Sequence, residues 1–193
     1  MDKIIDKKIV IDSCVLIYFC EDNDGGKTEE LINMLKENNN GIFMSDISGF
    51  EVLKNRQDSE KSINYEKLLN SIEGIPVDSP VFMNAATLCY LYKKIRKVTC
   101  REGEEMDPKD KLTGDLIIGG TVLSYENYLL LTSNKKDFPE PYWEVIATGE
   151  VGSVEKIKIY LMRPNIAALL SEIQTMEDIK MWPTKKRMHG FRG

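Results

Sequence analysis

The chain has 193 residues, of which 42% are hydrophobic and 30% are charged. This length suits one domain with an appendage, and the composition suits a folded, soluble protein and excludes wholesale disorder. No apolar run approaches the roughly 18–20 residues of a membrane-spanning helix, and the first residues mix acids with apolar side chains, unlike a signal peptide. We therefore expect a cytoplasmic protein with no membrane contact.

Charge is unevenly distributed along the chain. The net charge is −5, yet residues 180–193 contain five Lys or Arg side chains and no acid, so residues 1–179 carry −10. A chain that is mostly acidic is not a general binder of polyanions, but its basic tail can hold phosphate groups.

The cysteines form no recognisable metal motif. Cys14, Cys20, Cys89 and Cys100 include no C-x-x-C pair, and His189 is the single histidine. A structural zinc site is therefore not expected. Without a secretion signal, the cysteines are expected to be small buried residues rather than disulfides.

The hydrophobic pattern predicts strands that alternate with helices. In chain order, the first half predicts a strand at 8–12, an apolar segment at 15–20 that is either helix or more strand, a helix at 28–37, a strand at 42–44, a helix at 45–56, a helix through 68–72 and an extended segment at 75–77. The second half predicts a helix at 80–98, a loop at 99–111, a helix at 113–123, strands at 129–132, 143–148 and 157–161, and a helix at 165–173.

This alternation predicts an α/β protein with three layers, α/β/α, around a central and mostly parallel sheet. We assign residues 1–163 to one domain and residues 164–193 to a C-terminal helix and basic tail. In open sheets of this class, ligands bind outside the carboxyl ends of the strands. Acids that directly follow strands are therefore the first candidates for a functional site.

Familiar phosphate and calcium motifs fail near the start of the chain. Residues 26–28 are similar to the end of a P-loop, but Glu21 stands where the first glycine is required. The same turn is similar to a calcium loop, but its first ligand would be Cys20, which supplies no oxygen. A phosphatase of the haloacid dehalogenase type needs a second Asp two residues after Asp12, where the chain has Cys14. A receiver-type phosphoacceptor at Asp12 stays open as a weaker interpretation.

Four acids lie at the ends of predicted elements. They are Asp12 after the first strand, Glu51 within a helix, Asp115 at the start of a helix, and Asp137 after a strand. Each has an ordinary structural explanation, such as capping a helix or turn, pairing with a lysine, or favouring the helix dipole. Glu51 borders the buried side of its helix, where an acid is costly unless it is paired or bound to a metal.

Taken together and in this order, four sequence blocks resemble the PIN domain, and most closely the VapC-like toxin ribonucleases. The blocks are Ile9-Val10-Ile11-Asp12-Ser13, Ser45 through Leu53, Asp115 through Leu123, and Leu130 through Phe138, within a resemblance that covers Lys8 to about Leu161. The chain departs from the family at Gly119-Gly120, where members often carry Ala, and at Ser133, where they often carry a basic residue. The fourth acidic position is open between Asn134 and Asp137.

The resemblance implies a metal-dependent endoribonuclease that uses Mg²⁺ or Mn²⁺. It implies metal-binding and catalytic roles for Asp12, Glu51, Asp115 and Asp137, with hydrogen-bonding support from Ser13 and Asn134. Physical chemistry agrees, because converging carboxylates repel one another and a hard divalent cation with oxygen ligands relieves the repulsion. Such a metal can also activate water for phosphodiester hydrolysis.

The expected partners are RNA as substrate, an antitoxin protein and a second copy of the chain in a homodimer. In the basic tail, we predict that the cations contact RNA phosphates while neighbouring aromatic side chains stack on bases. These RNA-binding cations are Lys185, Lys186, Arg187 and Arg192. The alternative is a PIN-like module that binds RNA or protein without cutting.

Overall fold

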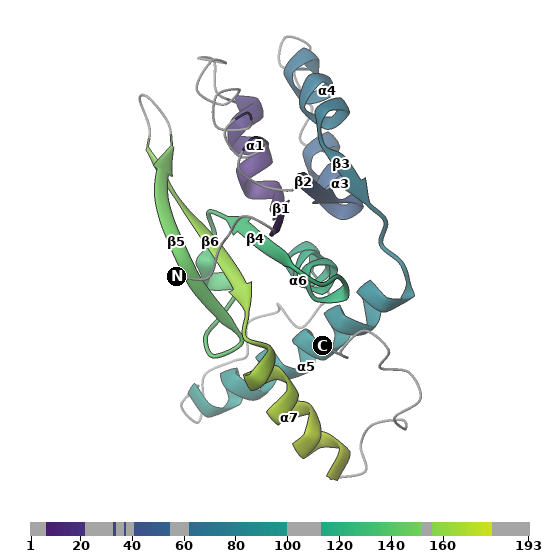
Figure 1. The fold of residues 1–193 in the computed structure, drawn as a ribbon, viewed down its shortest axis with the longest axis vertical. Helices are drawn as coiled ribbons and strands as arrows, with labels where there is room; N and C mark the ends of the chain where they lie inside the picture. The colour runs from purple at the N-terminus through teal and green to yellow at the C-terminus, as the bar shows by residue number, and fades with distance from the viewer. Residues whose placement is uncertain are drawn as a thin grey trace.

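A computed structural model of the chain describes residues 7–21, 33, 37, 41–54, 62–99, 113–151 and 156–178. Within these residues, six strands form one sheet in the order β3-β2-β1-β4-β6-β5 (Figure 1). The strands are β1 (Lys8–Ile11), β2 (Ile42–Ser45), β3 (Glu73–Ile75), β4 (Tyr128–Thr132), β5 (Trp143–Val151) and β6 (Ile157–Pro164).

The sheet is parallel on one side and antiparallel on the other. β1 pairs in parallel with β2 and β4, placing Ile9 opposite Ile42 and Leu129, and β2 pairs in parallel with β3. β6 runs antiparallel to both β4 and β5. The predicted mostly parallel sheet is therefore confirmed, with an antiparallel hairpin added at one edge.

Helices cover both faces of this sheet, as the three-layer prediction requires. The described helices are α1 (Ser13–Glu21), α3 (Asp46–Lys54), α4 (Ser62–Ser71), α5 (Ser79–Thr99), α6 (Gly114–Ser124) and α7 (Ile166–Asp178), with a short 3-10 turn, η2 (Lys135–Asp137). None of them is long and apolar enough to cross a membrane.

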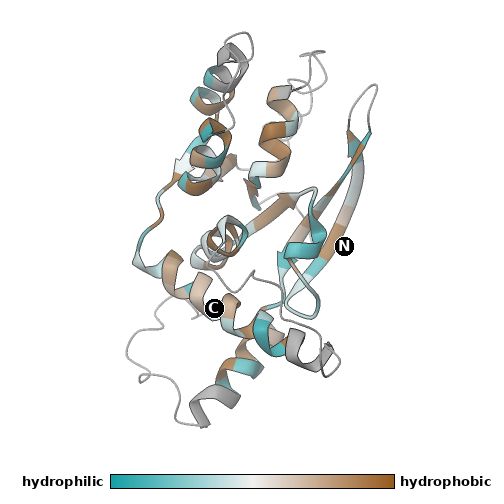
Figure 2. Ribbon diagram, turned by 180° about the vertical axis from the view of Figure 1, so that it is seen from behind, coloured by the Kyte–Doolittle hydropathy of each residue, from teal (hydrophilic) through white to brown (hydrophobic). Residues whose placement is uncertain are grey.

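Alternation of side chains along the strands divides the core into two clusters. Val10 lies in one cluster with Phe43 and Leu130, whereas Ile9 and Ile11 lie in the other. The first cluster includes side chains from α5, α6 and α7, and the second includes side chains from α1, α3 and α4. A strand covered on both faces needs a continuous apolar run. The ribbon of β4, near the centre of Figure 2, is accordingly mostly brown.

Helix α6 is buried along nearly its whole length, from Leu116 to Leu123. Its neighbour α5 comes so close that a Cβ on Gly120 would lie 2.5 Å from the carbonyl oxygen of Val81 and 2.9 Å from the amide nitrogen of Ala85. Backbone contact therefore requires glycine at position 120. The glycine at this position therefore has a packing reason in this chain.

Several predicted boundaries differ from the observed ones. The extended segment predicted at 75–77 was wrong by two residues, because β3 pairs through residues 73–75 and Pro76 has no N–H to continue a ladder. Strands β5 and β6 run three residues beyond their predicted ends, where β5 is mostly exposed and its Gly and Glu residues give no hydrophobic signal. Segment 15–20 is helical, as part of α1.

Some predictions lie outside the described residues. The helix predicted at 28–37 does so except for residues 33 and 37, which are helical. The loop at 99–111 lies outside apart from Thr99, the last residue of α5. The predicted domain boundary between residues 163 and 164 falls one residue before the end of β6.

Candidate active site

The order of the strands reverses between β1 and β4. From β1 the chain builds β2 and β3 on one side, whereas β4 and β6 lie on the other. In open α/β sheets, the carboxyl ends of the strands at such a switch point border a crevice in which ligands bind. Asp12 directly follows β1, and Asn134 and Asp137 follow β4, so these three residues lie at the switch point (Figure 1).

The other two acids reach the same edge on helices. Helix α6 ends only a few residues before β4 begins and leads into it, so its first turn, with Asp115, lies near the carboxyl end of that strand. Helix α3 begins directly after β2 and carries Glu51. Both α6 and α3 contact each other in the fold. The topology therefore gathers residues from four distant segments.

Asp12 is a buried carboxylate with an exposed fraction of 1%. The Thr132 hydroxyl donates a 2.6 Å hydrogen bond to its Oδ2 atom, and the Cys14 thiol donates to the same atom at 3.1 Å. The Ser13 hydroxyl donates to Oδ1 at 3.3 Å. Three neutral side chains thus fix the orientation of the carboxylate.

The backbone of Asp12, and not its carboxylate, begins helix α1. Its carbonyl oxygen accepts the N–H groups of Val15 at 3.1 Å and Leu16 at 3.2 Å, while its own N–H donates to the carbonyl of Leu131 at 2.9 Å. Side-chain capping of the following helix therefore does not explain this acid.

Cys14 lies between Asp12 and the residues that follow β4. The Ser133 hydroxyl donates to its Sγ atom at 3.0 Å, and the Ser133 N–H does so at 3.4 Å. Burial, and then the nearby Asp12 charge, raise the pKa of the Cys14 thiol to about 11. The thiol therefore stays protonated at neutral pH and serves as a donor to Asp12.

The Glu51 carboxylate lies against the first turn of α6. A Cβ on Gly114 would lie 2.1 Å from Oε1 of Glu51 and 2.8 Å from its Cδ atom. Only a glycine at this position leaves the carboxylate in its observed place. Because Gly114 directly precedes Asp115, the contact brings Glu51 next to the segment that carries the third acid.

Asp115 and Asp137 line a common pocket of about 120 Å³. Tyr92 of α5 lines it as well, and its hydroxyl accepts the indole N–H of Trp143 at 2.6 Å. Burial raises the pKa of the Tyr92 hydroxyl, and the charges of Asp115 and Asp137 raise it further. The pocket therefore presents a neutral phenol beside two carboxylates.

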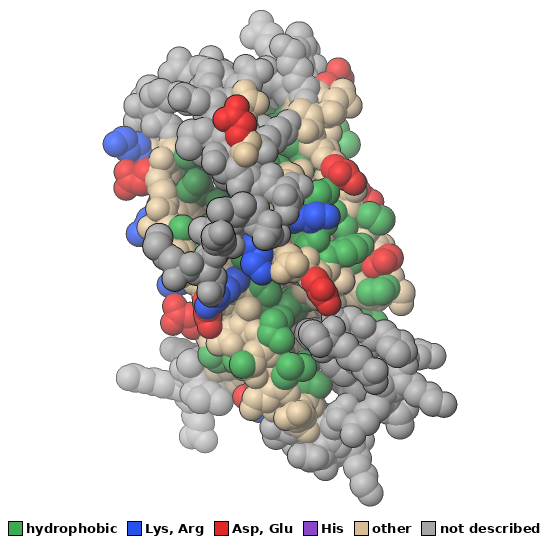
Figure 3. All heavy atoms as spheres, in the orientation of Figure 1, with side chains coloured by type: hydrophobic (Ala, Val, Ile, Leu, Met, Phe, Trp, Pro, Cys, Tyr) green, Lys and Arg blue, Asp and Glu red, His purple; other side chains and the backbone are tan. Residues whose placement is uncertain are grey.

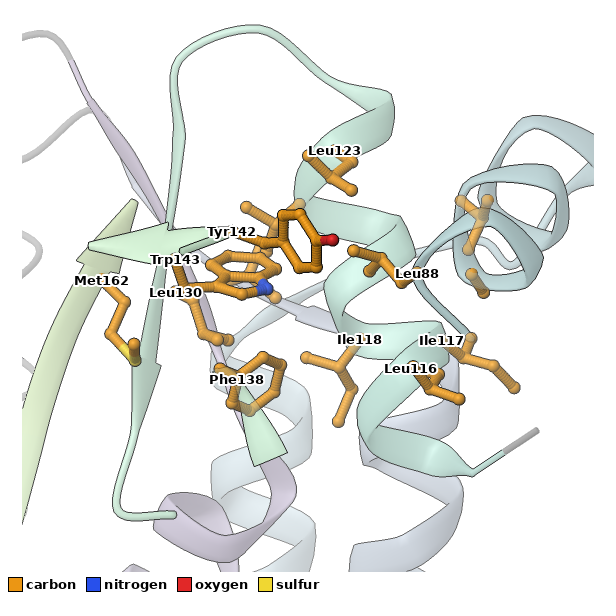
Figure 4. Close-up of a cluster of buried hydrophobic side chains, with 14 of the residues drawn as sticks. Leu88, Leu116, Ile117, Ile118, Leu123, Leu130, Phe138, Tyr142, Trp143 and Met162 are labelled. Carbon is orange, nitrogen blue, oxygen red and sulfur yellow. The ribbon is translucent and has the colours of Figure 1, made fainter. Parts of the chain in front are cut away.

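Asn134 and Asp137 are joined within the turn after β4. The Asn134 side-chain amide donates to Oδ2 of Asp137, and the Asn134 N–H donates to the Thr132 hydroxyl at 2.9 Å. Directly after the turn, Phe138 is fully buried and packs edge-to-face on Trp143, with the ring centroids 5.3 Å apart (Figure 4). Packing of Phe138 on Trp143 holds the turn on the core, and Thr132 connects the turn to Asp12.

The four acids do not form one tight cluster. Glu51 meets the start of α6, Asp115 shares a pocket with Asp137, and Asp12 is bonded to Thr132, which also holds Asn134. Across the ranges that the structure describes, no three His, Cys, Asp or Glu side chains lie close enough to hold one metal ion.

The donor chemistry nevertheless fits Mg²⁺ or Mn²⁺. Carboxylate and amide oxygens are the ligands that these hard cations take. Glu51, Asp115 and Asp137 are half-buried side chains, whereas Asp12 is fully buried. One ion bound at this edge would require the half-buried acids to move toward Asp12.

Sequence reasoning missed several residues of this edge. Thr132 was assigned only to a strand, and Cys14 only to the core, although both contact the Asp12 carboxylate. Tyr92 and two lysines of the pocket, Lys93 and Lys136, carried no motif. The four tail cations predicted to bind RNA, Lys185, Lys186, Arg187 and Arg192, lie outside the described residues.

No protein-family model matches the sequence, and no curated protein matches it. Solved structures do match. One is a crystal structure of VapBC2 from Rickettsia felis bound to a DNA fragment from its promoter. It is 18% identical to this chain with a TM-score of 0.49, and the match covers 68% of this chain and 90% of that one. DNA-bound VapBC from Salmonella typhimurium is 17% identical with a TM-score of 0.49 and the same coverage. At such identities, a functional assignment has to come from the chain's own residues.

Proposed function

We propose that this chain is a metal-dependent endoribonuclease that hydrolyses RNA phosphodiester bonds. The proposal is supported by the topology, which brings the four segments that carry Asp12, Glu51, Asp115 and Asp137 to the carboxyl edge at the switch between β1 and β4. Structural needs do not require four acids at one edge, because like charges destabilise one another.

In this proposal, Asp12, Glu51 and Asp115 hold Mg²⁺ or Mn²⁺, and Asp137 binds the metal or orients a water molecule. The bound metal would activate water and stabilise the charge that builds on the phosphodiester. Ser13 fixes Asp12 through its hydrogen bond, and Asn134 fixes Asp137. A buried, oriented Asp12 beside three half-buried acids suits a site in which one ligand is fixed in the interior and the others face the substrate side.

Cleavage of a labelled single-stranded RNA in Mn²⁺, with EDTA as control, tests the proposal. Wild type should cleave only with the metal. Asp12→Asn, Glu51→Gln and Asp115→Asn should each lower the rate by at least about 100-fold, since even outer-shell partners of metal sites are worth about 10- to 100-fold. Glu126→Gln is the matched control and should cleave like wild type, because Glu126 is an exposed acid in the turn between α6 and β4, at the amino end of β4 and the opposite edge of the sheet.

One alternative is a protein with the same fold but no catalytic activity. The spacing of the acids, with no three of them close together among the described residues, is compatible with a module that binds RNA or protein without cutting. Wild type that binds the RNA but leaves it intact in Mn²⁺ would support this module and contradict the nuclease. An antitoxin partner, a homodimer and RNA contacts by the basic tail remain predictions that accompany the nuclease proposal. A small antitoxin-like reading frame beside the gene would support the toxin assignment.

A further inference from the structure

Two lysines line the pocket that holds Asp115 and Asp137. Lys93 comes from α5, and Lys136 comes from the turn after β4, so the fold brings together two cations that are distant in the sequence. Thr113, directly before α6, adds a hydroxyl group to the same wall. The pocket therefore combines two carboxylates with two ammonium groups and a neutral donor.

Each pocket lysine has a lysine next to it in the sequence that is engaged elsewhere. Lys94 pairs with Glu172 of α7, and Lys135 pairs with Glu140 at 3.2 Å. Neither of these two lines the pocket. Lys93 and Lys136 line the pocket and their neighbours Lys94 and Lys135 do not, which makes the neighbours matched controls.

The charges in the pocket indicate what the two lysines can do there. Two carboxylates repel a phosphate that approaches them, and two ammonium groups in the same pocket offset that repulsion. On the face drawn in Figure 3, described acidic and basic side chains are interspersed with hydrophobic ones, with no continuous basic stripe among them. Lys93 and Lys136 are the cations that line the pocket beside the acids, so they are the candidates for phosphate contact there.

The size of the pocket suits one charged group of a larger substrate. Its volume of about 120 Å³ is well below the roughly 300–1,000 Å³ of pockets that enclose a whole small ligand. A phosphate of a polynucleotide fits this description, since the remainder of the chain stays on the surface.

We propose that Lys93 and Lys136 form a phosphate subsite that holds the backbone of single-stranded RNA next to Asp115 and Asp137. The inference rests on the proposed ribonuclease function and adds to it the residues that position the substrate. Both lysines act through charge and hydrogen bonding to phosphate oxygens, so the subsite carries no base preference.

Binding of a fluorescent single-stranded RNA to the full chain in EDTA, over a series of salt concentrations, tests the subsite without cleavage. Each contact between a cationic side chain and a phosphate of a single strand adds about 0.7 to the slope of the logarithm of affinity against the logarithm of salt concentration. Loss of one contact therefore lowers the affinity about fivefold at 0.1 M salt. Lys93→Gln and Lys136→Gln should each show this loss in affinity and slope. The matched variants Lys94→Gln and Lys135→Gln should bind like wild type.

Two results would overturn the subsite: wild type that binds no RNA, or pocket variants that bind like their matched neighbours. The outcome is separable from that of the nuclease proposal. If the wild type cleaves RNA in Mn²⁺ and all four lysine variants bind RNA alike, the subsite is contradicted and the nuclease proposal is supported. If only Lys93→Gln and Lys136→Gln lose affinity and slope, and the wild type never cleaves RNA, the subsite is supported and the nuclease proposal is contradicted.

Discussion

Asp12 illustrates how a buried carboxylate is accommodated at the end of a strand. Transfer of a charged group out of water costs several kcal/mol unless hydrogen bonds replace the lost hydration. Thr132, Cys14 and Ser13 supply those bonds, and all three are neutral side chains. A lysine or arginine partner would have neutralised the acid, whereas neutral donors leave its negative charge available to a cation.

The Cys14 thiol gives a prediction that depends on pH. Burial and the Asp12 charge raise its pKa from 9.0 to about 11, so its thiolate fraction at pH 8 is about 100-fold below that of an unperturbed thiol. Iodoacetamide should therefore label Cys14 at least about 100-fold more slowly in the native protein than in urea, as followed by mass spectrometry of its peptide.

The pH profile of this labelling separates the effect of charge from the effect of access. The native rate should keep rising up to about pH 11 rather than level off near pH 9. Because the folded pKa is raised, the protonated thiol contributes stability that is present below pH 9 and is lost as the pH rises through about 11. Native labelling at the rate seen in urea would show that Cys14 is not held as described.

At the scale of elements, the contact between α5 and α6 positions the first turn of α6. Gly120 lets the two backbones approach, and the same helix carries Asp115 at its start. The Phe138 anchor on Trp143 acts in the same way for the turn after β4. Asp115 and Asp137 are therefore each positioned by packing some distance away along the chain.

Two glycine-to-alanine variants test this packing. Gly120→Ala places a Cβ against the backbone of α5 and should lower the free energy of unfolding by about 1–3 kcal/mol through overpacking. Gly49→Ala meets nothing closer than 3.7 Å and should be neutral or stabilising by up to about 1 kcal/mol, because alanine favours a helix. Urea unfolding measures both, and equal effects would contradict the close approach of α5 to α6.

Elements with a strong local pattern were predictable from the sequence. Residues 9–11 of β1 and residues 116–123 of α6 are buried and mostly apolar, and these hydrophobic runs predicted both elements. β3 was misplaced because it is an edge strand whose pairing residues are exposed, so its position depends on β2 rather than on its own sequence. The exposed part of β5 was missed for the same reason.

The candidate site was predictable only in its acids. A strand followed by Asp12, and acids near the starts of helices, are local features that one sequence can show. The bond from Thr132 to Asp12 spans 120 residues, and the shared pocket of Lys93 and Lys136 depends on how α5 crosses the turn after β4. No spacing along the chain encodes such contacts, because they arise from tertiary packing.

At the scale of the whole molecule, the sheet order decides where the acids meet. Parallel strands with helical crossovers bring every strand-to-helix junction to one edge, and the reversal of order at β1 and β4 opens that edge to a ligand. The acidic balance of residues 1–179 then makes a cation the natural partner of this edge. A metal shared by the acids is the central claim, and it connects the topology to the chemistry.

The shift in melting temperature on addition of Mn²⁺ tests this claim most directly. A ligand that binds only the folded state stabilises it by about 2.7 kcal/mol at a hundredfold excess over its Kd, which raises the Tm of a protein of this size by about 5–10 °C. Asp12→Asn, Glu51→Gln and Asp115→Asn should each reduce the shift, whereas the control Glu126→Gln should retain it. An equal shift in wild type and all three variants, or no shift in wild type, would contradict a metal site built from these carboxylates.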